Sequence, residues 1–296
     1  MLIDSMEQQV YKNALEHFEL KGTPKQIQGL QSVIRQLCSV QSGRQVIQKA
    51  VANSKSKISI EFNENMTEQN KRTEPSGAFF QKGNRIELVP ISTDIPEMTP
   101  EQKISTELHM ASILAHELQH ASMNKYIDQL CENANNRDAL LFACRLVEAN
   151  AYLRGYSVHE ELDIKFQPQI QVYQHPDNPK GRWSIAKGPN DPNLSKYPNK
   201  TLTRVQTMND PKRRLQFLQD ALSGKQNGAN HSADNAMSRI QPTKKDRPSN
   251  PQFYQAIQTF LTDMQFDMPV DQVLAMGNLP PQSKQQSLFS RLFRTR

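Results

Sequence analysis

Apolar residues in the first fifty positions recur at intervals of three and four, the spacing of one helix face. Gly22, Thr23 and Pro24 interrupt this pattern, and Pro24 suits the first turn of a helix with Thr23 as its cap. The sequence therefore predicts two N-terminal helices that cover one face of a domain. Their apolar positions are Val10, Leu15 and Phe18 in the first, and Ile27, Leu30, Val33, Ile34 and Leu37 in the second.

The pattern changes after residue 57 to alternation of apolar and polar positions, which continues to Phe62 and predicts a strand. Two further strands are expected at residues 77–81 and 85–89. A short turn that contains Gly83 would join them as a hairpin. Pro90 limits the second of these strands because proline has no backbone donor.

Two long helices are predicted in the middle of the chain, at residues 100–126 and 138–154. Thr99 is a suitable cap for the first, in which apolar side chains and alanines recur at helical spacing and form a face to be buried. The second helix is the most apolar of the chain, and Gly155 is expected to end it.

Prolines interrupt every candidate element that follows Phe166, so long loops are expected there. Helical patterns return at residues 211–222 and 251–264. Between them, residues 223–250 are rich in Gly, Asn and Ser and resemble a linker.

The order of these elements predicts an α+β fold. Residues 1–165 would form one domain, in which a small antiparallel sheet packs on the helix at 100–126. Residues 166–296 would form a mostly helical, loop-rich region for substrate or partner recognition.

Composition narrows the class of protein. The net charge of +6 comes from scattered Lys and Arg without interleaved aromatic residues, which argues against a nucleic-acid partner. The cysteines, Cys38, Cys131 and Cys144, are odd in number and lack CxxC spacing, so neither a disulfide framework nor a thiolate zinc site is expected. No stretch resembles a signal peptide or a membrane span. We therefore expect a protein that is cytoplasmic at synthesis.

The candidate chemistry lies in the pentapeptide 116–120, His-Glu-Leu-Gln-His, within the first long helix. Residues four apart stack on one helix face, so His116 and His120 can bind one tetrahedral Zn²⁺. Zinc lowers the pKa of a bound water, and Glu117 can then accept its proton as a general base. The alternative is an exposed helix that carries two surface histidines.

A catalytic zinc site has three protein ligands, so another element should supply one more. Glu148 is the preferred candidate, because a carboxylate in the most apolar helix is costly to bury unless a cation meets it. An ion pair of Glu148 with Arg145 or Arg154 is the competing interpretation. His159, Glu160 and Glu161 are alternative ligands. His109 could approach the same helix face, as a structural residue or a partner of a ligand.

The pentapeptide, its flanking alanines and the downstream Glu-Ala-Asn-Ala segment resemble the gluzincin group of zinc metallopeptidases. The likeness covers residues 76–156. It implies a zincin-like catalytic domain with His116, His120 and Glu148 as zinc ligands and Glu117 as the base. It also suggests Asn150, or a neighbouring residue, as a partner of a ligand. The interval from His120 to Glu148 is longer than in thermolysin-like enzymes.

Further expectations follow from this resemblance. In zincins an edge strand before the active-site helix binds the extended substrate, and here that strand would comprise Arg85, Ile86, Glu87, Leu88 and Val89. A Tyr, His or Arg near the zinc stabilises the oxyanion, and the candidates are Tyr152, Tyr156 and His159.

The sequence thus favours a zinc-dependent endopeptidase that cleaves a protein. The nearest look-alikes are small bacterial metallopeptidase-like domains, several of them translocated effectors, for which the substrate would be a host protein in the host cell. The alternatives are a zinc-stabilised, non-catalytic binding or regulatory module and a zinc hydrolase of another amide. The basic, Leu- and Phe-containing end at 287–296 could contact an anionic membrane or a partner, although ten residues are too few for firm anchoring.

Overall fold

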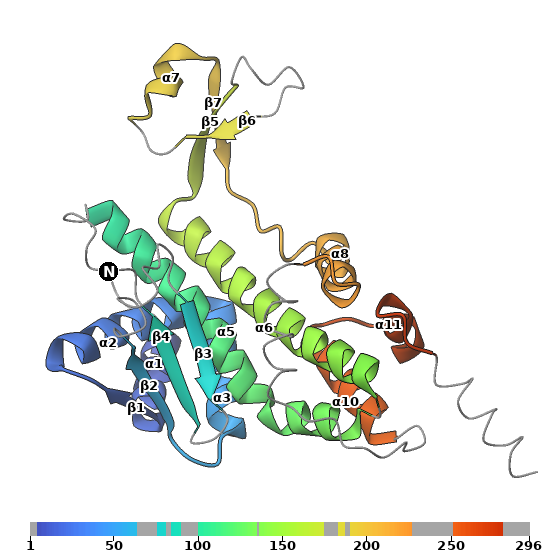
Figure 1. Cartoon of the computed structure of the whole chain (residues 1–296). Helices are drawn as coiled ribbons and strands as arrows, with labels where there is room; N and C mark the ends of the chain where they lie inside the picture. Colours follow the sequence, from blue (N-terminus) through green and yellow to red (C-terminus); the bar gives the residue numbers. More distant parts are fainter. Residues whose placement is uncertain are drawn as a thin grey trace, which may run out of the picture.

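The computed structural model describes residues 5–63, 76–80, 84–89, 100–134, 136–174, 183–186, 190–226 and 251–280 of the chain. Within these ranges the fold is mixed α+β, with nine helices, a four-stranded sheet and a three-stranded sheet (Figure 1). A long helical hairpin runs between the four-stranded sheet and the C-terminal helices. The predicted α+β class is therefore confirmed.

The N-terminal region holds three helices and a short strand where two helices were predicted. Thr23 and Gln26 form the capping box of the second helix, and Pro24 is in its first turn, as expected. The third helix begins without a side-chain cap from its own N-cap residue. Instead, the Ser42 backbone N–H donates to Glu161 from a distant helix. The elements are α1 (Ser5–His17), β1 (Phe18–Lys21), α2 (Pro24–Cys38) and α3 (Gln41–Asn53).

The four-stranded sheet has the order β1-β2-β4-β3 and mixed strand directions. Strands β1, β2 and β4 are parallel to one another, and only β3 and β4 are antiparallel. The prediction of a small antiparallel sheet is therefore correct for the hairpin alone. The remaining strands are β2 (Ile58–Phe62), β3 (Ser76–Phe80) and β4 (Arg85–Val89).

Strand β4 lies inside the sheet, between β2 and β3, so the prediction that it forms the edge is wrong. Ile86 and Leu88 are completely buried, as in a central strand covered on both faces. Glu87 is also buried, and its carboxylate accepts from Asn63 and pairs with Arg85. Within the described ranges the edge beside the long helix is β3.

The helical hairpin consists of α5 (Pro100–Asn133) and α6 (Arg137–Phe166), both longer than predicted. Gly155 was expected to end the second helix but lies inside it. A Cβ at this position would come within 3.1 Å of the Ser112 carbonyl oxygen on α5. Gly155 therefore permits the close approach of the two helices. The packing that this allows offsets the usual destabilising effect of glycine inside a helix.

The C-terminal region contains a small sheet that was predicted as loops. Its strands are antiparallel in the order β6-β5-β7. The helices predicted near 211–222 and 251–264 are confirmed as α8 and α10. The predicted linker at 223–250 and the segment 287–296 fall outside the described residues, except for 223–226. The elements are β5 (Gln169–Gln174), β6 (Trp183–Ile185), α7 (Pro192–Lys196), β7 (Asn199–Thr203), α8 (Pro211–Leu222), α10 (Pro251–Asp263) and α11 (Val270–Met276).

Two large hydrophobic clusters hold the described chain together. The first joins the N-terminal helices, the four-stranded sheet and most of α5. The second joins the end of α5 and the first half of α6 to α8, α10 and α11. The C-terminal helices thus pack directly on the hairpin, while the domain boundary at residue 165 stays a prediction. No helix among the described residues is long and apolar enough to cross a membrane.

Candidate metal centre

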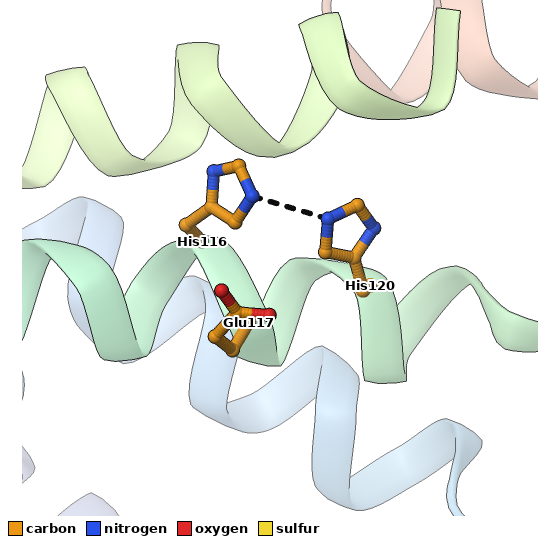
Figure 2. A group of neighbouring side chains, drawn as sticks. All are labelled: His116, Glu117 and His120. Atoms are coloured by element: carbon orange, nitrogen blue, oxygen red, sulfur yellow. Dashed lines mark hydrogen bonds between the residues drawn. The ribbon is translucent and has the colours of Figure 1, made fainter. Parts of the chain in front are cut away.

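The two histidines of the pentapeptide project from successive turns of α5 toward the same point. Figure 2 shows their imidazole rings facing each other, and the two Nε2 atoms are 3.1 Å apart. The His116 side chain is 15% exposed and the His120 side chain 11% exposed. Together with Glu117 they form the one group of potential metal ligands found in the described part of the chain.

Glu148 completes this group from the opposite helix. Its Oε2 atom lies 3.6 Å from His116 Nε2, and its Oε1 atom lies 3.7 Å from His120 Nε2. The antiparallel hairpin brings it there, because α6 returns along the face of α5 that carries the histidines. The structure therefore brings Glu148 close to both histidines.

The alternative partners of Glu148 are engaged elsewhere. The guanidinium of Arg145 donates to the Leu222 carbonyl, and that of Arg154 donates to Gln45. Neither forms an ion pair with Glu148 among the described residues. The carboxylate of Glu148 thus faces the two imidazoles.

The alternative ligands are also used for other contacts. Glu160 accepts from the Thr207 hydroxyl and from the Met208 backbone N–H. Glu161 accepts from the backbone N–H and the hydroxyl of Ser42, and so caps α3. Both carboxylates hold secondary structure elements in place instead of approaching the histidines.

The spacing of the three side chains suits a zinc ion. With zinc–ligand bonds of about 2.0–2.2 Å, tetrahedral coordination separates two ligand atoms by about 3.4 Å. The two Nε2 atoms are 3.1 Å apart. Different oxygens of Glu148 lie 3.6 Å from His116 Nε2 and 3.7 Å from His120 Nε2, close to this value. Two imidazoles and one carboxylate also match a known ligand set of catalytic zinc.

The two histidines differ in their affinity for protons. Burial lowers the pKa of His116, but the hydrogen bond to Glu148 and the charges of Glu117 and Glu148 outweigh it, and the pKa is raised. Burial lowers the pKa of His120 to about 4, with an opposing contribution from Glu148 and a smaller lowering by His116. A proton is therefore held on His116 in preference to His120, whose imidazole is ready to bind a metal.

Glu117 lies beside the histidines but is buried under strand β3. It is 6% exposed, and a Cβ at Gly77 would lie 3.0 Å from its Oε1 atom and 3.0 Å from its Cγ atom. The strand thus passes directly over the carboxylate at the one residue that has no side chain. Sequence reasoning missed Gly77, although a glycine inside a strand is a known signal of close backbone approach.

Of the residues considered for the oxyanion, Tyr152 is nearest to the histidines. Its ring centroid is 4.6 Å from that of His116, with the rings at 73°. Tyr156 lies one turn further along α6, is 40% exposed, and places its ring 5.9 Å from that of Tyr152. Tyr152 is therefore in position to contact a group bound at the centre.

The other predicted neighbours lie apart from the three ligand candidates. His109 and His159 contact each other with ring centroids 5.9 Å apart, and His159 Nε2 is 3.7 Å from Asp163. His109 precedes His116 by seven residues, about 10 Å along the helix axis. Asn150 lines a cavity on another face of α6. The structure does not bring these three residues to the centre.

Comparison of the chain with models of protein families, with curated proteins and with solved structures finds no match. The centre is therefore defined by its geometry: a histidine pair and Glu117 on one helix, with Glu148 opposite.

Proposed function

We propose that the chain is a zinc-dependent endopeptidase. The observation that carries this proposal is the placement of His116, His120 and Glu148 at the spacing of tetrahedral zinc ligands, with the carboxylate of Glu117 beside them. A structural zinc site would need no such carboxylate and would use a fourth protein ligand. The set of two histidines and a glutamate leaves one coordination position for water or substrate.

In the proposed mechanism, His116, His120 and Glu148 would hold a zinc ion. Zinc bound there would polarise the scissile carbonyl and lower the pKa of the attacking water. Glu117 accepts the proton from that water and then delivers it to the leaving amide nitrogen. Its burial beneath β3 limits the contact of the carboxylate with bulk solvent. The Tyr152 ring lies next to His116, and its hydroxyl is the candidate donor to the oxyanion.

The proposed substrate is an extended segment of a protein that adds to the edge of the sheet. Strand β3 supports this role because it is the edge nearest α5, and Gly77 brings its backbone against Glu117. Backbone pairing along β3 would carry a peptide past the carboxylate. A host-cell protein is the specific substrate proposed by analogy with translocated bacterial domains.

Replacing Gly77 by Ala should lower kcat/KM by about 10- to 100-fold, because a small displacement of a catalytic group is enough for such a loss. The new methyl group would meet Ile113 at 2.7 Å and Glu117 at 3.0 Å, so either the strand or the carboxylate must move. Peptide hydrolysis and bound zinc should be measured on the same samples. The control is Ala78→Ser, at the next, exposed position. Wild-type hydrolysis by the Gly77 variant would show that the close contact has no catalytic importance.

Zinc binding should release more than half a proton per molecule at about pH 6.5 and less at higher pH. The proton comes from His116, because its raised pKa keeps it more protonated than an ordinary histidine, which is half neutral at this pH. Calorimetric titration in buffers with different ionisation enthalpies measures this number. A His17→Gln variant, altered at an exposed histidine of α1, should release the same number. Zinc binding without proton release at pH 6.5 would contradict the assignment of the proton to His116.

A comparison of new protein N-termini tests the proposed activity. Cell extracts exposed to the wild-type protein should contain cleaved N-termini that are missing after exposure to a Glu117→Gln variant. The extracts should include those of a host cell, because a substrate that only the host makes would be missing from extracts of other cells. If the protein retains zinc but produces no new N-termini in any extract, the non-catalytic binding module becomes the better description.

A further inference from the structure

A polar cavity of about 250 Å³ lies where the C-terminal helices meet α3 and α6. Five of its lining residues recur on one face of α6, at positions 150, 153, 154, 157 and 161. Glu148 and Tyr152 lie on a different face of that helix, so the cavity and the metal centre are on separate sides of α6. Arg214 of α8 and Asp263 of α10 close the cavity from the C-terminal region.

The cavity contains two guanidinium groups that no carboxylate pairs with in the described parts of the chain. Arg154 donates to the side-chain oxygen of Gln45 at 3.2 Å. Arg214 donates to the backbone carbonyls of Met208 and Met264. All of these acceptors are neutral, so both guanidinium groups keep several N–H donors that the described residues do not use.

The two carboxylates of the lining already have donors of their own. Glu161 accepts from the backbone N–H and hydroxyl of Ser42. Asp263 pairs with Lys49 and accepts from the Gln119 amide. The negative charges thus serve other contacts, which leaves the cavity with an excess of hydrogen-bond donors.

The electrostatics of the two arginines agree with this excess. Burial lowers the pKa of Arg154, although Asp263 and Glu161 partly oppose the shift. Burial and the charge of Arg154 lower the pKa of Arg214, with a smaller opposing effect of Asp263. Two cations that repel each other in a poorly solvated place are stabilised when an anion binds between them.

Asn150 supplies a separate observation that points to a ligand. Its side chain lines the cavity and is 3% exposed, and its Nδ2 atom has no hydrogen-bond partner among the described residues. A buried amide without a partner destabilises a fold, so such groups in native proteins call for an explanation. The Asn150 amide thus keeps an unused donor in the wall of the cavity.

We propose that this cavity is a binding site for a small oxyanion, either a phosphate or a carboxylate group, held by Arg154, Arg214 and the Asn150 amide. Guanidinium groups match the paired oxygens of both anions. A bound anion would link α6 to the start of α8, because Arg154 and Arg214 belong to these two helices. The site is independent of the proposed peptidase activity.

Calorimetric titration of the full chain with inorganic phosphate, and separately with succinate, tests the proposal. Ionic strength is held constant with NaCl, because a change in the screening of charges by salt could alter the Tm without any specific binding. We expect saturable binding of at least one of the two anions, and a rise in Tm of about 3 °C at saturation. The tighter anion identifies the head group. Failure of both to bind would overturn the proposal.

Three variants locate the site. Arg154→Gln should weaken binding by about tenfold or more, because one charged donor is lost. Asn150→Asp places a carboxylate in the cavity, and should abolish anion binding without lowering the Tm of the anion-free protein. Arg213→Gln removes an exposed charge next to Arg214 and should bind as the wild type does. If both cavity variants bind the anion as tightly as the wild type does, the proposed site is wrong. The site is also wrong if anion binding is lost on removal of zinc, because the anion would then bind at the metal centre.

Discussion

Replacement of Glu117 by Gln should lower kcat/KM for peptide hydrolysis by about 1,000-fold, because an amide cannot accept the proton of the attacking water. The two side chains have nearly the same size, so the buried position beneath β3 should stay filled. The ligands His116, His120 and Glu148 are unchanged. Zinc content should therefore equal that of the wild type.

The measurement pairs hydrolysis of a peptide library, followed by mass spectrometry, with metal analysis by atomic spectroscopy. Glu132→Gln is the matched control, since Glu132 is exposed near the end of the same helix. It should leave both hydrolysis and zinc content unaltered. Full activity of the Glu117 variant would rule out the proposed general base and with it the peptidase mechanism.

Replacement of Glu148 by Gln should raise the Kd for zinc by about 100-fold or more, since removal of a partner outside the ligand set already weakens zinc binding by about 10- to 100-fold. The carboxylate faces both Nε2 atoms and supplies the negative charge of the proposed ligand set. A neutral amide is a poorer zinc ligand. Hydrolysis should decline in parallel as the ion is lost.

Competition with a chromophoric chelator measures the affinity of this variant. Glu160→Gln, on the same helix, removes a carboxylate that contacts Thr207 and Met208 and should retain wild-type zinc affinity. Circular dichroism shows whether each variant keeps its helices. A folded Glu148 variant with unchanged zinc affinity would exclude Glu148 as a ligand.

The candidate centre was largely predictable from the sequence because its determinants are local. The pentapeptide fixes the relative positions of His116, Glu117 and His120 once a helix forms, and the apolar pattern around them predicts that helix. Glu148 could be chosen because a carboxylate in an apolar helix needs a cation. Its rivals Glu160 and Glu161 were removed only by contacts with distant residues.

The features that sequence reasoning missed depend on contacts between distant segments. Strand β1 is short and is stabilised by parallel pairing with β2, some forty residues later. That pairing, with the pairing of β2 to β4, moved the sheet edge to β3. Gly155 has the local signature of a helix end, but its lack of a side chain serves packing against Ser112. The arginine-lined cavity also requires residues from both ends of the chain.

The location of the centre within one helical hairpin has a consequence for how the protein folds. The proposed ligands lie between His116 and Glu148, so bringing them together closes a short loop at a small entropic cost. Pairing of β1 with β2 and packing of α10 on α5 join segments further apart in the chain. Contacts between near neighbours in sequence form faster than distant ones. Zinc could thus stabilise the hairpin first, as a template on which the sheet and the C-terminal helices assemble.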